Sequence, residues 1–557
     1  MATTSLKLVL CWHMHQPDYR NYLDDTYVLP WTYLHAIKDY SDMAWHLEQH
    51  PDMRCVVNFA PVLLDQLEDY VFQFDIGPLR DPLLALLGKP DEALIEEEAV
   101  ERILQFCFRN NHAHMLEPFP AYRRLYELYR LVQEDGAGFG YFGPHFYADL
   151  VTWYHLSWTG ESLRRTVPLI SKLMEKASGY TEADRNALLM CIGDTIRGLI
   201  GRYRKLAERG QIELSANPQQ HPILPLLIDF KVARENTPDM QLPNAESYPG
   251  GEARAVWHVK EAIEKHKRRF GKKPNGMWPS EGGVSMAVLD LFENQELQWT
   301  ASSEAVLAAS IHLKGESLEN KAAWLYRPYK FSTPQERICC FFRDERLSDL
   351  IGFEYAQWFA RDAVQHFLHQ LEQIAGAVDE GGVVSVILDG ENAWETYPYN
   401  GYYFLSQLYD ALDTSDRIAT SIFSECLESA GKLEKLVAGS WVYGTFSTWM
   451  GSAEKNLAWD LLCEGKLAVD ETLASKRLDA IQVAALMRQL ANCEGSDWFW
   501  WFGDYNNPES VRLFDRVFRD NLIRLYEIMD VVPPPRLNVP LCTGGQSEGS
   551  GTMRRVT

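Results

Sequence analysis

The sequence lacks the motifs that mark several large enzyme classes. It has no GxGxxG after a strand pattern, no GxxxxGK(S/T), no GxSxG and no HExxH, so dinucleotide, nucleoside-phosphate, serine-hydrolase and zincin chemistry have no motif to support them. No apolar run approaches the ~20 residues of a membrane helix. The apolar run near the amino terminus, about six residues, is too short for a secretory signal. We therefore expect a cytoplasmic protein with no membrane partner.

Positive charge is also scarce. The chain has 54 Lys and Arg against 77 Asp and Glu, for a net charge of −23. Because phosphate binding needs clustered Lys and Arg, nucleic acid is not expected as a partner. The ten cysteines form no CxxC pair, and the adjacent Cys339 and Cys340 suit neither an ordinary disulfide nor a zinc site. Free thiols in a reducing compartment are expected, without a metal or another cofactor.

Short apolar runs that end in polar residues recur along the chain. They lie at residues 6–12, 55–60, 212–216, 276–278, 299–302, 338–342 and 383–388. Helical patterns separate many of them, for example residues 252–270, where apolar positions follow helical spacing between charged ones. Strands alternating with helices imply a parallel sheet. The sequence predicts an α/β fold, a closed or nearly closed β/α barrel of about seven strands; an open doubly wound sheet is the alternative.

The composition along the chain predicts three parts. Residues 1–440 are expected to form the barrel, with a mostly helical insertion at about 71–210. Residues 441–532 carry helical patterns and are expected to form a helical domain packed against the barrel. Residues 533–557 contain PPP and GGQSEGSG and are predicted to be a flexible tail.

Histidines follow two of the predicted strands. His13 and His15, in WHMHQP, are two positions apart and point to the same side of a strand. They suit hydrogen bonds to hydroxyl groups, half of a metal site, or a pair of structural histidines. Glu213 and His221 lie in QIELSANPQQHP and could line the same site, although turn structure alone also explains the prolines there.

Carboxylates follow two further strands. Glu281, in MWPSEGG, precedes two glycines that let the backbone turn sharply; the structural alternative is a Glu at a helix N-terminus. Asp389 and Glu391, in ILDGENAWE, end a buried strand, where carboxylates are costly unless used or paired. Their mutual repulsion could raise the pKa of one of them, as a general acid requires; a Ca²⁺ or structural carboxylate site is the alternative.

An aromatic run lies in DWFWWFGDYNN. Residues 498–502 cannot all be buried on one helix face, and aromatic rings stack on the apolar faces of sugar rings. Trp500 is therefore a candidate for binding a sugar. A core cluster that joins the helical domain to the barrel is the structural alternative.

Taken in order, these stretches resemble the five signature regions of glycoside hydrolase family 57. The resembling segments are HMHQP, HPILPLL, MWPSEGGVS, ILDGENAWE and SDWFWWFGD; RDERLSDLIGF and WMGSAEKNLAW resemble the α-amylase-like branch. The resemblance implies a (β/α)7 barrel with a helical C-terminal domain and a retaining mechanism on α-glucans. The implied activity is cleavage of α-1,4-glucosidic bonds, with 4-α-glucanotransfer or branching as alternatives.

The resemblance also implies roles for individual residues. Glu281 matches the nucleophile and Asp389 the general acid/base, which requires carboxyl groups about 5–5.5 Å apart. The positions that match the donor subsite are His13, His15, Glu213, His221, Trp278, Glu391 and Trp394. Asp504 matches the acidic residue of the fifth region, but Tyr505 and Asn506 replace a carboxylate and a histidine usual in the α-amylase-like branch.

Two other classes stay open from the sequence. Metal-dependent polysaccharide deacetylases and zinc α-mannosidases also use incomplete β/α barrels, and His13 and His15 could hold a metal with Asp389 or Glu391. A non-catalytic glucan-binding protein is the second alternative. Such a protein is expected to have lost Glu281 or Asp389, whereas this chain has both.

Overall fold

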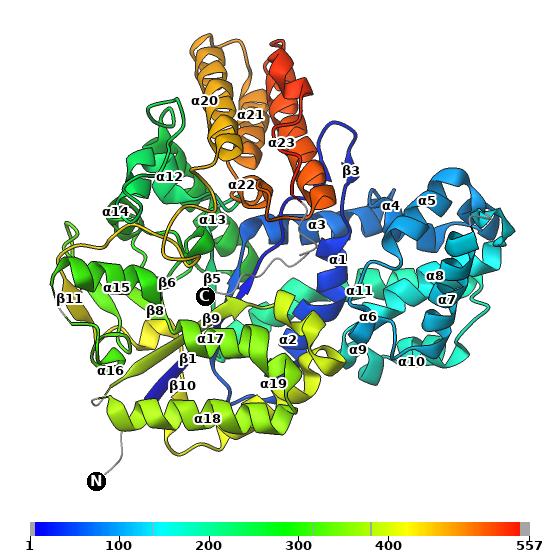
Figure 1. Cartoon of the computed structure of the whole chain (residues 1–557), viewed down its shortest axis with the longest axis horizontal. Helices are drawn as coiled ribbons and strands as arrows, with labels where there is room; N and C mark the ends of the chain where they lie inside the picture. Colours follow the sequence, from blue (N-terminus) through cyan, green and yellow to red (C-terminus); the bar gives the residue numbers. More distant parts are fainter. Residues whose placement is uncertain (1–5, 136–137, 316, 379–380, 546–557) are drawn as a thin grey trace.

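The computed structural model describes residues 6–135, 138–315, 317–378 and 381–545. A mostly parallel sheet lies at its centre (Figure 1). Its strands are β1 (Leu6–Met14), β4 (Cys55–Phe59), β5 (Ile212–Ala216), β6 (Trp299–Ser303), β7 (Tyr329–Phe331), β8 (Cys339–Arg343), β9 (Val383–Asp389), β10 (Ile418–Thr420) and β11 (Gly431–Leu433). Six of these nine strands are the apolar runs expected from the sequence. The run at 276–278 contributes only isolated bridges.

The strand order follows an incomplete barrel. The sheet runs β11-β7-β8-β9-β1-β4-β5, and β6 pairs with β8. Between β5 and β6, single parallel bridges from Ala216 to Met277 and from Gly276 to Trp299 replace continuous pairing. Among the described residues the sheet therefore does not close through continuous strands. The predicted α/β fold with an incomplete β/α barrel is confirmed.

Alternation along β1 decides which side chains face the barrel interior. Val9 and Cys11 belong to a small interior core with Val56 of β4 and Ile387 of β9. Leu8, Leu10 and Trp12 belong instead to the larger core formed with the surrounding helices. Because side chains alternate in a strand, the next interior position after Cys11 is His13. The apolar runs are buried on both faces, as is usual in parallel sheets.

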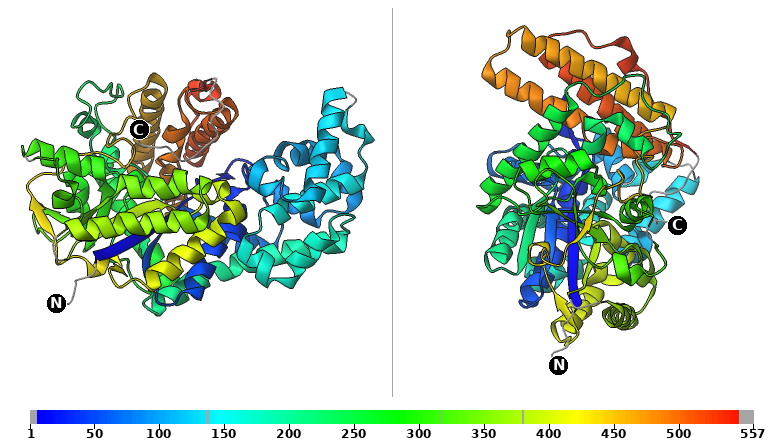
Figure 2. Two further views of the ribbon diagram at one scale, coloured as in Figure 1. Left: turned by 60° about the horizontal axis from the view of Figure 1, so that its bottom comes forward. Right: turned by 90° about the vertical axis from the view of Figure 1, so that its left-hand side faces the viewer.

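A helical lobe lies to one side of the sheet. The long helices α3 (Pro61–Ile76) and α11 (Glu182–Glu208) connect it to the barrel, and the helices between them project to the right in Figure 1 and in the left view of Figure 2. These are α4 (Pro82–Ala85), α5 (Glu97–Phe106), α6 (His112–Met115), α7 (Pro120–Asp135), α8 (Pro144–Ser157), α9 (Glu161–Thr166) and α10 (Pro168–Lys176). Residues 71–210 are thus mainly helical, as expected.

Four helices near the carboxyl end lie together above the sheet in Figure 1. They are α20 (Ala453–Ala474), α21 (Ala480–Cys493), α22 (Asp497–Trp501) and α23 (Pro508–Ile528). In the predicted tail, residues 546–557 lie outside the described part of the chain, and the preceding segment contains the short helix η12 (Pro535–Asn538), whose Leu537 is buried. The exact domain boundaries stay predictions.

A buried ion pair fastens these helices to the barrel. Glu494, which follows α21, accepts hydrogen bonds from Arg254 Nη2 at 2.6 Å and from Tyr248 Oη at 2.6 Å. His258 Nε2 lies 2.7 Å from the same carboxylate. Arg254 and His258 belong to α13 (Gly251–Phe270), which packs against β5. Although burial opposes ionisation, Arg254 and His258 hold the pKa of Glu494 at about 2.

Replacing Glu494 is expected to destabilise the protein. Glu494→Gln leaves the Arg254 charge buried without its partner, which costs about 3–5 kcal/mol near neutral pH. A carboxyl with a lowered folded pKa contributes stability above its unfolded pKa, here 4.5, and loses it as the pH falls toward about 2. The loss of melting temperature on mutation should therefore be full at pH 7 and shrink below pH 4.5. Glu471→Gln, on the exposed side of α20, is the control and should melt like the unmodified chain.

Candidate active site

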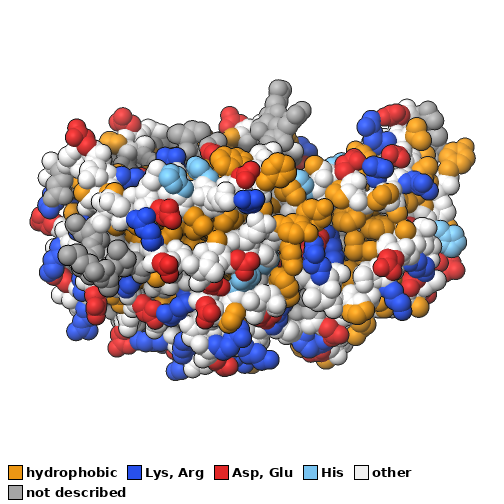
Figure 3. Space-filling view, turned by 90° about the horizontal axis from the view of Figure 1, so that it is seen from below, with side chains coloured by type: hydrophobic (Ala, Val, Ile, Leu, Met, Phe, Trp, Pro, Cys, Tyr) orange, Lys and Arg blue, Asp and Glu red, His pale blue; other side chains and the backbone are white. Residues whose placement is uncertain are grey.

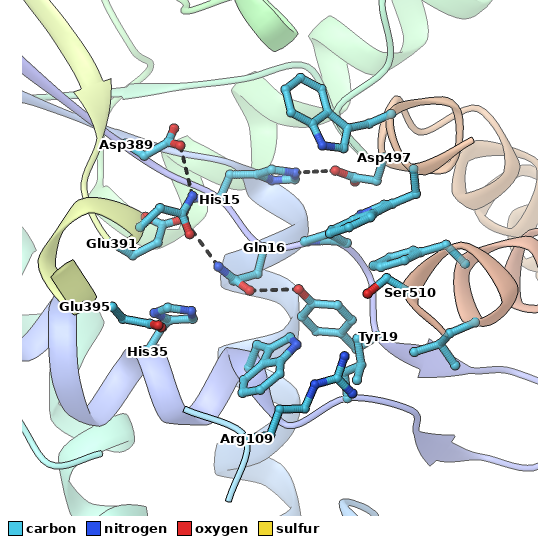
Figure 4. Close-up of a pocket in the computed structure, with 18 of the residues that line it drawn as sticks. His15, Gln16, Tyr19, His35, Arg109, Asp389, Glu391, Glu395, Asp497 and Ser510 are labelled. Atoms are coloured by element: carbon cyan, nitrogen blue, oxygen red, sulfur yellow. Dashed lines mark hydrogen bonds and ion pairs between the residues drawn. The ribbon is translucent and has the colours of Figure 1, made fainter. Parts of the chain in front are cut away.

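One large cavity opens where the strands of the barrel end. Its volume is about 1170 Å³, above the roughly 300–1,000 Å³ of ordinary small-molecule sites. Its lining includes the carboxyl ends of β1, β8 and β9, the segment from Asp24 to His35, the helical lobe around α5, the segment around Trp441, and the C-terminal helices α22 and α23. Figure 4 shows Asp389, His15 and Asp497 around one end of this cavity.

A stack of histidines forms one wall. The rings of His15 and His221 lie 3.9 Å apart and nearly parallel, and His13 stacks beside both. Each ring also contacts a polar side chain outside the stack. His13 Nδ1 is 2.7 Å from Asn58 Oδ1, His221 Nδ1 is 2.9 Å from Ser496 Oγ, and His15 Nε2 is 2.8 Å from Asp497 Oδ1.

The three imidazoles differ in charge because their partners differ. Burial lowers the pKa of His13 to about 3, and it lowers the pKa of His221 well below its ordinary value. Burial acts in the same direction on His15, but the Asp497 carboxylate outweighs it and raises the pKa of His15. The carboxylates of Glu281 and Asp389 also raise that pKa, so His15 is the member of the stack whose surroundings favour a positive charge.

Glu281 lies on a turn with an unusual backbone conformation. Its φ of 57° is in the left-handed region, which costs a non-glycine residue about 1–2 kcal/mol. The next residue, Gly282, has a φ of 60°, and a Cβ there would lie 3.0 Å from Trp441 Cβ, so glycine is required. Trp441 holds Glu281 twice: its Nε1 donates to Glu281 Oε2 at 2.8 Å, and its backbone N donates to Glu281 O at 2.9 Å.

The surroundings of Glu281 change its acidity. Burial raises the pKa of Glu281 to about 7, although the indole N–H of Trp441 and the nearby His15 both act to lower it. The carboxylates of Asp497 and Asp389 raise it further. His221 Nδ1 lies 3.9 Å from Glu281 Oε1. A glutamate in this setting exchanges its proton near neutral pH.

Asp389 ends β9 directly opposite His13 of β1. Asn392 Nδ2 donates to Asp389 Oδ2 at 2.9 Å. Burial raises the pKa of Asp389, while Asn392, His15 and Arg343 act against the rise. Glu391, two residues on, is more deeply buried; burial and then the Asp389 charge raise its pKa well above the ordinary value. The pKa values of all three carboxyl groups are therefore raised, mainly by burial.

Several buried polar atoms around this end of the cavity have no partner among the described residues. They are His15 Nδ1, His221 Nε2, Trp278 Nε1 and Glu391 Oε2. Buried polar atoms are nearly always hydrogen-bonded in folded proteins, and leaving one unpaired costs about 1–3 kcal/mol. Of the four residues, His15 and Glu391 line the cavity, whereas His221 and Trp278 are fully buried behind it.

The structure brings most of the residues proposed from the sequence to this place. His13, His15, Glu281, Asp389, Glu391 and Trp500 line the cavity. His221 and Trp278 lie directly behind them, fully buried, with the Trp278 ring 6.3 Å from His13 and 5.1 Å from Trp441.

Three residues proposed from the sequence lie elsewhere. Glu213 is near the amino end of β5, away from the strand ends that form the cavity, and accepts from Trp299 Nε1 at 2.8 Å. Trp394 packs behind the site against Trp12 and donates to Gly390 O at 2.8 Å. Asp504 is exposed on the loop after α22 and does not line the cavity.

The loop around Asp504 has a supporting role. Asn506 Nδ2 donates at 3.0 Å to the carbonyl oxygens of Trp500 and Trp501 and so fixes the end of α22. Tyr505 accepts a hydrogen bond from Lys455 Nζ at 2.6 Å. The acidic residue of this stretch that reaches the cavity is Asp497, at the other end of the aromatic run.

The sequence reasoning missed four residues of the site. Arg343 and Asn58 could have been found, because each is a polar residue at the end of a recognised strand. Trp441 and Asp497 reach Glu281 and His15 from segments 160 and 482 residues away. Nothing local in the sequence signals such distant contacts.

One group of side chains has the composition of a metal site. The ligand atoms of His15, His221 and Asp497 all lie within 4.8 Å of one another. A metal ligand must offer a lone pair, and so must be deprotonated. The raised pKa of His15 means that a metal would have to displace a proton from its imidazole, whereas the contact with Asp497 is already made as a hydrogen bond.

Comparison with known proteins gives one family. The model of glycosyl hydrolase family 57 matches residues 9–437, which is well over half of the chain. No curated protein sequence matches the chain.

Solved structures share the fold. The α-amylase AmyC from Thermotoga maritima aligns with a TM-score of 0.57 at 13% identity, covering 94% of this chain and 93% of that one. A branching enzyme from Pyrococcus horikoshii aligns with a TM-score of 0.54 at 15% identity and covers 99% of both chains. The 4-α-glucanotransferase from Thermococcus litoralis aligns with a TM-score of 0.52 at 13% identity, covering 94% of this chain and 60% of that one.

The hydrogen bond from Trp441 predicts a measurable pKa change. The indole N–H stabilises the ionised form of Glu281, so Trp441→Phe should raise the pKa of Glu281 above its value of about 7. Carbon-13 NMR titration of labelled glutamate side chains measures this pKa, and the signal is assigned by its absence in Glu281→Gln. Trp45→Phe, on α2 (Ser41–Gln49), is the control. A pKa of Glu281 that is unchanged in Trp441→Phe would contradict the assignment.

Proposed function

The chain belongs to glycosyl hydrolase family 57, and on this premise we propose that it is a retaining enzyme that cleaves α-1,4-glucosidic bonds in α-glucans. The observation that carries the proposal is the pairing of Glu281 and Asp389 in one cavity, surrounded by buried polar atoms that lack partners. Of the residues that carry those atoms, His15 and Glu391 line the cavity and can bond the hydroxyl groups of a sugar.

In the first step, the Glu281 carboxylate attacks the anomeric carbon of the bound sugar. The bond from that carbon to the glycosidic oxygen breaks, and the oxygen takes the proton of Asp389. Glu281 is then joined covalently to the sugar, and the rest of the glucan leaves with a free hydroxyl group. The proton held by the carboxyl pair near neutral pH is the one this step consumes.

In the second step, the Asp389 carboxylate removes a proton from an incoming hydroxyl group. The oxygen attacks the anomeric carbon and displaces Glu281, which regains its charge. Two displacements at one carbon retain its configuration. Protonated His15 lies near both carboxylates throughout and limits the repulsion between them.

The shape and chemistry of the cavity favour a neutral glucan over other polymers. Carboxylates, histidines and tryptophans line it, and the chain carries a net charge of −23, which disfavours a polyanionic substrate or a nucleic acid. On the face shown in Figure 3, positive and negative side chains are interspersed rather than gathered by sign. Trp441, Trp500 and Trp501 provide aromatic surface for sugar rings.

The acceptor decides between hydrolysis and transfer. Water gives shorter glucans, whereas a sugar hydroxyl gives new linkages, and both use the same carboxyl pair. The structurally similar proteins include an α-amylase, a branching enzyme and a 4-α-glucanotransferase. We propose hydrolysis as the main reaction, and product analysis decides between the two.

A reducing, cytoplasmic location fits the state of the thiols. All ten cysteines are free and nine are buried, including the adjacent Cys339 and Cys340. No helix among the described residues is long and apolar enough to span a membrane.

Replacing either carboxylate should abolish turnover of α-glucans. Asp389→Asn removes the general acid/base and should lower kcat on amylose about 10²–10⁴-fold, and Glu281→Gln should lower it at least as far, because no intermediate can form. Incubation with maltoheptaose and amylose, followed by chromatography of the products, measures the effect. Products shorter than the substrate indicate hydrolysis; longer products in addition indicate transfer.

Matched variants separate the two roles. Azide should restore turnover of an activated glucoside by Glu281→Ala and give the β-glycosyl azide, because azide then attacks from the side of the missing nucleophile. With Asp389→Ala it should give the α-glycosyl azide through the covalent intermediate. Glu235→Gln, outside the cavity, should behave like the unmodified chain. Full activity in Glu281→Gln would contradict the assignment of the nucleophile.

Removal of metal should leave the reaction intact. Protonated His15 and Asp497 form an ion pair in place of a metal site. After dialysis against EDTA, kcat/KM on maltoheptaose should be unchanged, and elemental analysis should find no stoichiometric zinc. Loss of activity on dialysis together with recovery on adding zinc would favour the alternative metal-dependent class.

A further inference from the structure

The cavity has a second polar end, away from the two carboxyl groups. Figure 4 shows Asp389 and Glu391 at one end and Glu395, His35 and Arg109 at the other. No residue of this second end takes part in the two chemical steps described above.

His35 is held there by a buried charge pair. It ends α1 (Trp31–His35) and precedes the π-helical turn η1 (Ala36–Tyr40). His35 Nδ1 is 2.6 Å from Asp39 Oδ2, and Lys38 Nζ is 2.6 Å from Asp39 Oδ1. Both Lys38 and Asp39 are almost fully buried, and burying such a pair costs desolvation energy that folding alone does not require. Single π-helical turns are rare in proteins, and those that occur are often found at functional sites.

The contact with Asp39 leaves the other ring nitrogen of His35 for a ligand. His35 lines the cavity, and among the described residues none hydrogen-bonds to its Nε2. Trp158 packs edge-on against the imidazole at 5.5 Å, and its buried Nε1 also has no partner in the described part of the chain. The same holds for Asn110 Oδ1. Three unpartnered polar groups thus line this end.

The charges at this end select a neutral ligand. Glu395 lines it together with Arg109, whose Nη1 is already 3.3 Å from Glu509 Oε1 (Figure 4). A phosphate or carboxylate ligand would meet these glutamates, and an apolar ligand would leave the polar groups unpaired. A sugar ring meets both demands, because its hydroxyl groups donate and accept while its face can pack on the half-buried Trp31, whose ring centroid lies 5.6 Å from that of Trp158.

Polar side chains lie between the two ends. Gln16 Nε2 donates to Glu391 Oε1 at 3.4 Å, and Tyr19 Oη donates to Gln16 Oε1 at 2.9 Å (Figure 4). We propose that His35, Glu395, Trp158 and Asn110 form a distal sugar subsite, which binds a unit of the glucan chain remote from the bond that is cleaved. This inference rests on the proposed function. It makes the enzyme selective for chains long enough to reach from Glu281 to His35.

Kinetics on malto-oligosaccharides of increasing length test the subsite. For the unmodified chain, KM should fall at the length that first reaches the distal subsite. His35→Ala and, separately, Glu395→Gln should each raise KM for maltoheptaose about tenfold. This is the change expected from the loss of one hydrogen bond to a charged group. kcat should be unchanged, and so should KM for the shortest oligosaccharide that is cleaved. Glu395→Gln does not touch the π-helical turn, so it tests the subsite even if His35→Ala folds poorly.

Two controls and a binding measurement separate the possible failures. His312→Ala and Glu372→Gln are exposed outside the cavity and should leave KM unchanged at every length. Calorimetry on Glu281→Gln with maltoheptaose should show binding that weakens when His35→Ala is added. The distal subsite is overturned if both cavity variants change KM equally at all lengths, or if neither changes it. Either result leaves the proposed function intact. If the unmodified chain neither cleaves nor binds any malto-oligosaccharide, the proposed function falls and the subsite falls with it.

Discussion

Parallel pairing between β1 and β9 places the reactive groups. The register sets His13 beside Asp389, and the backbone N of Gly390 donates to His13 O at 2.7 Å. Glycine between Asp389 and Glu391 leaves room for Met14, because a Cβ at Gly390 would lie 2.3 Å from Met14 Sδ and that side chain would have to move. A slip of one residue would turn Asp389 away from the barrel interior. His15 directly follows β1, so the same pairing places both Asp389 and His15 at the cavity.

Burial of these groups then determines their chemistry. It raises the pKa of Glu281 and of Asp389, and it keeps His13 neutral. Only His15, paired with Asp497 of the C-terminal helices, gains charge in the stack. The electrostatics of the proposed catalytic centre therefore depend on docking of these helices, which the buried Arg254–Glu494 pair also stabilises.

Much of the fold and the centre of the site could be predicted because their signals are local. Apolar runs that end in polar residues identified the main strands, and the rule that ligands bind at strand ends placed His13, Glu281 and Asp389 together. The same local patterns do not indicate that Glu213 lies near the amino end of β5, away from the cavity. Asp497 reaches the site only through the packing of distant helices, and it lies there while Asp504 of the same stretch is exposed.

The proposed mechanism is a double displacement by Glu281 and Asp389. The anomeric configuration of the first product is the most direct test of that mechanism. Proton NMR should follow the anomeric signals of the new reducing end during the first minutes of cleavage of maltoheptaose, before mutarotation mixes them. The account predicts that the α-anomer forms first and that the β-anomer appears later at the rate of mutarotation. Initial formation of the β-anomer would mean a single displacement by water and would contradict the role given to Glu281.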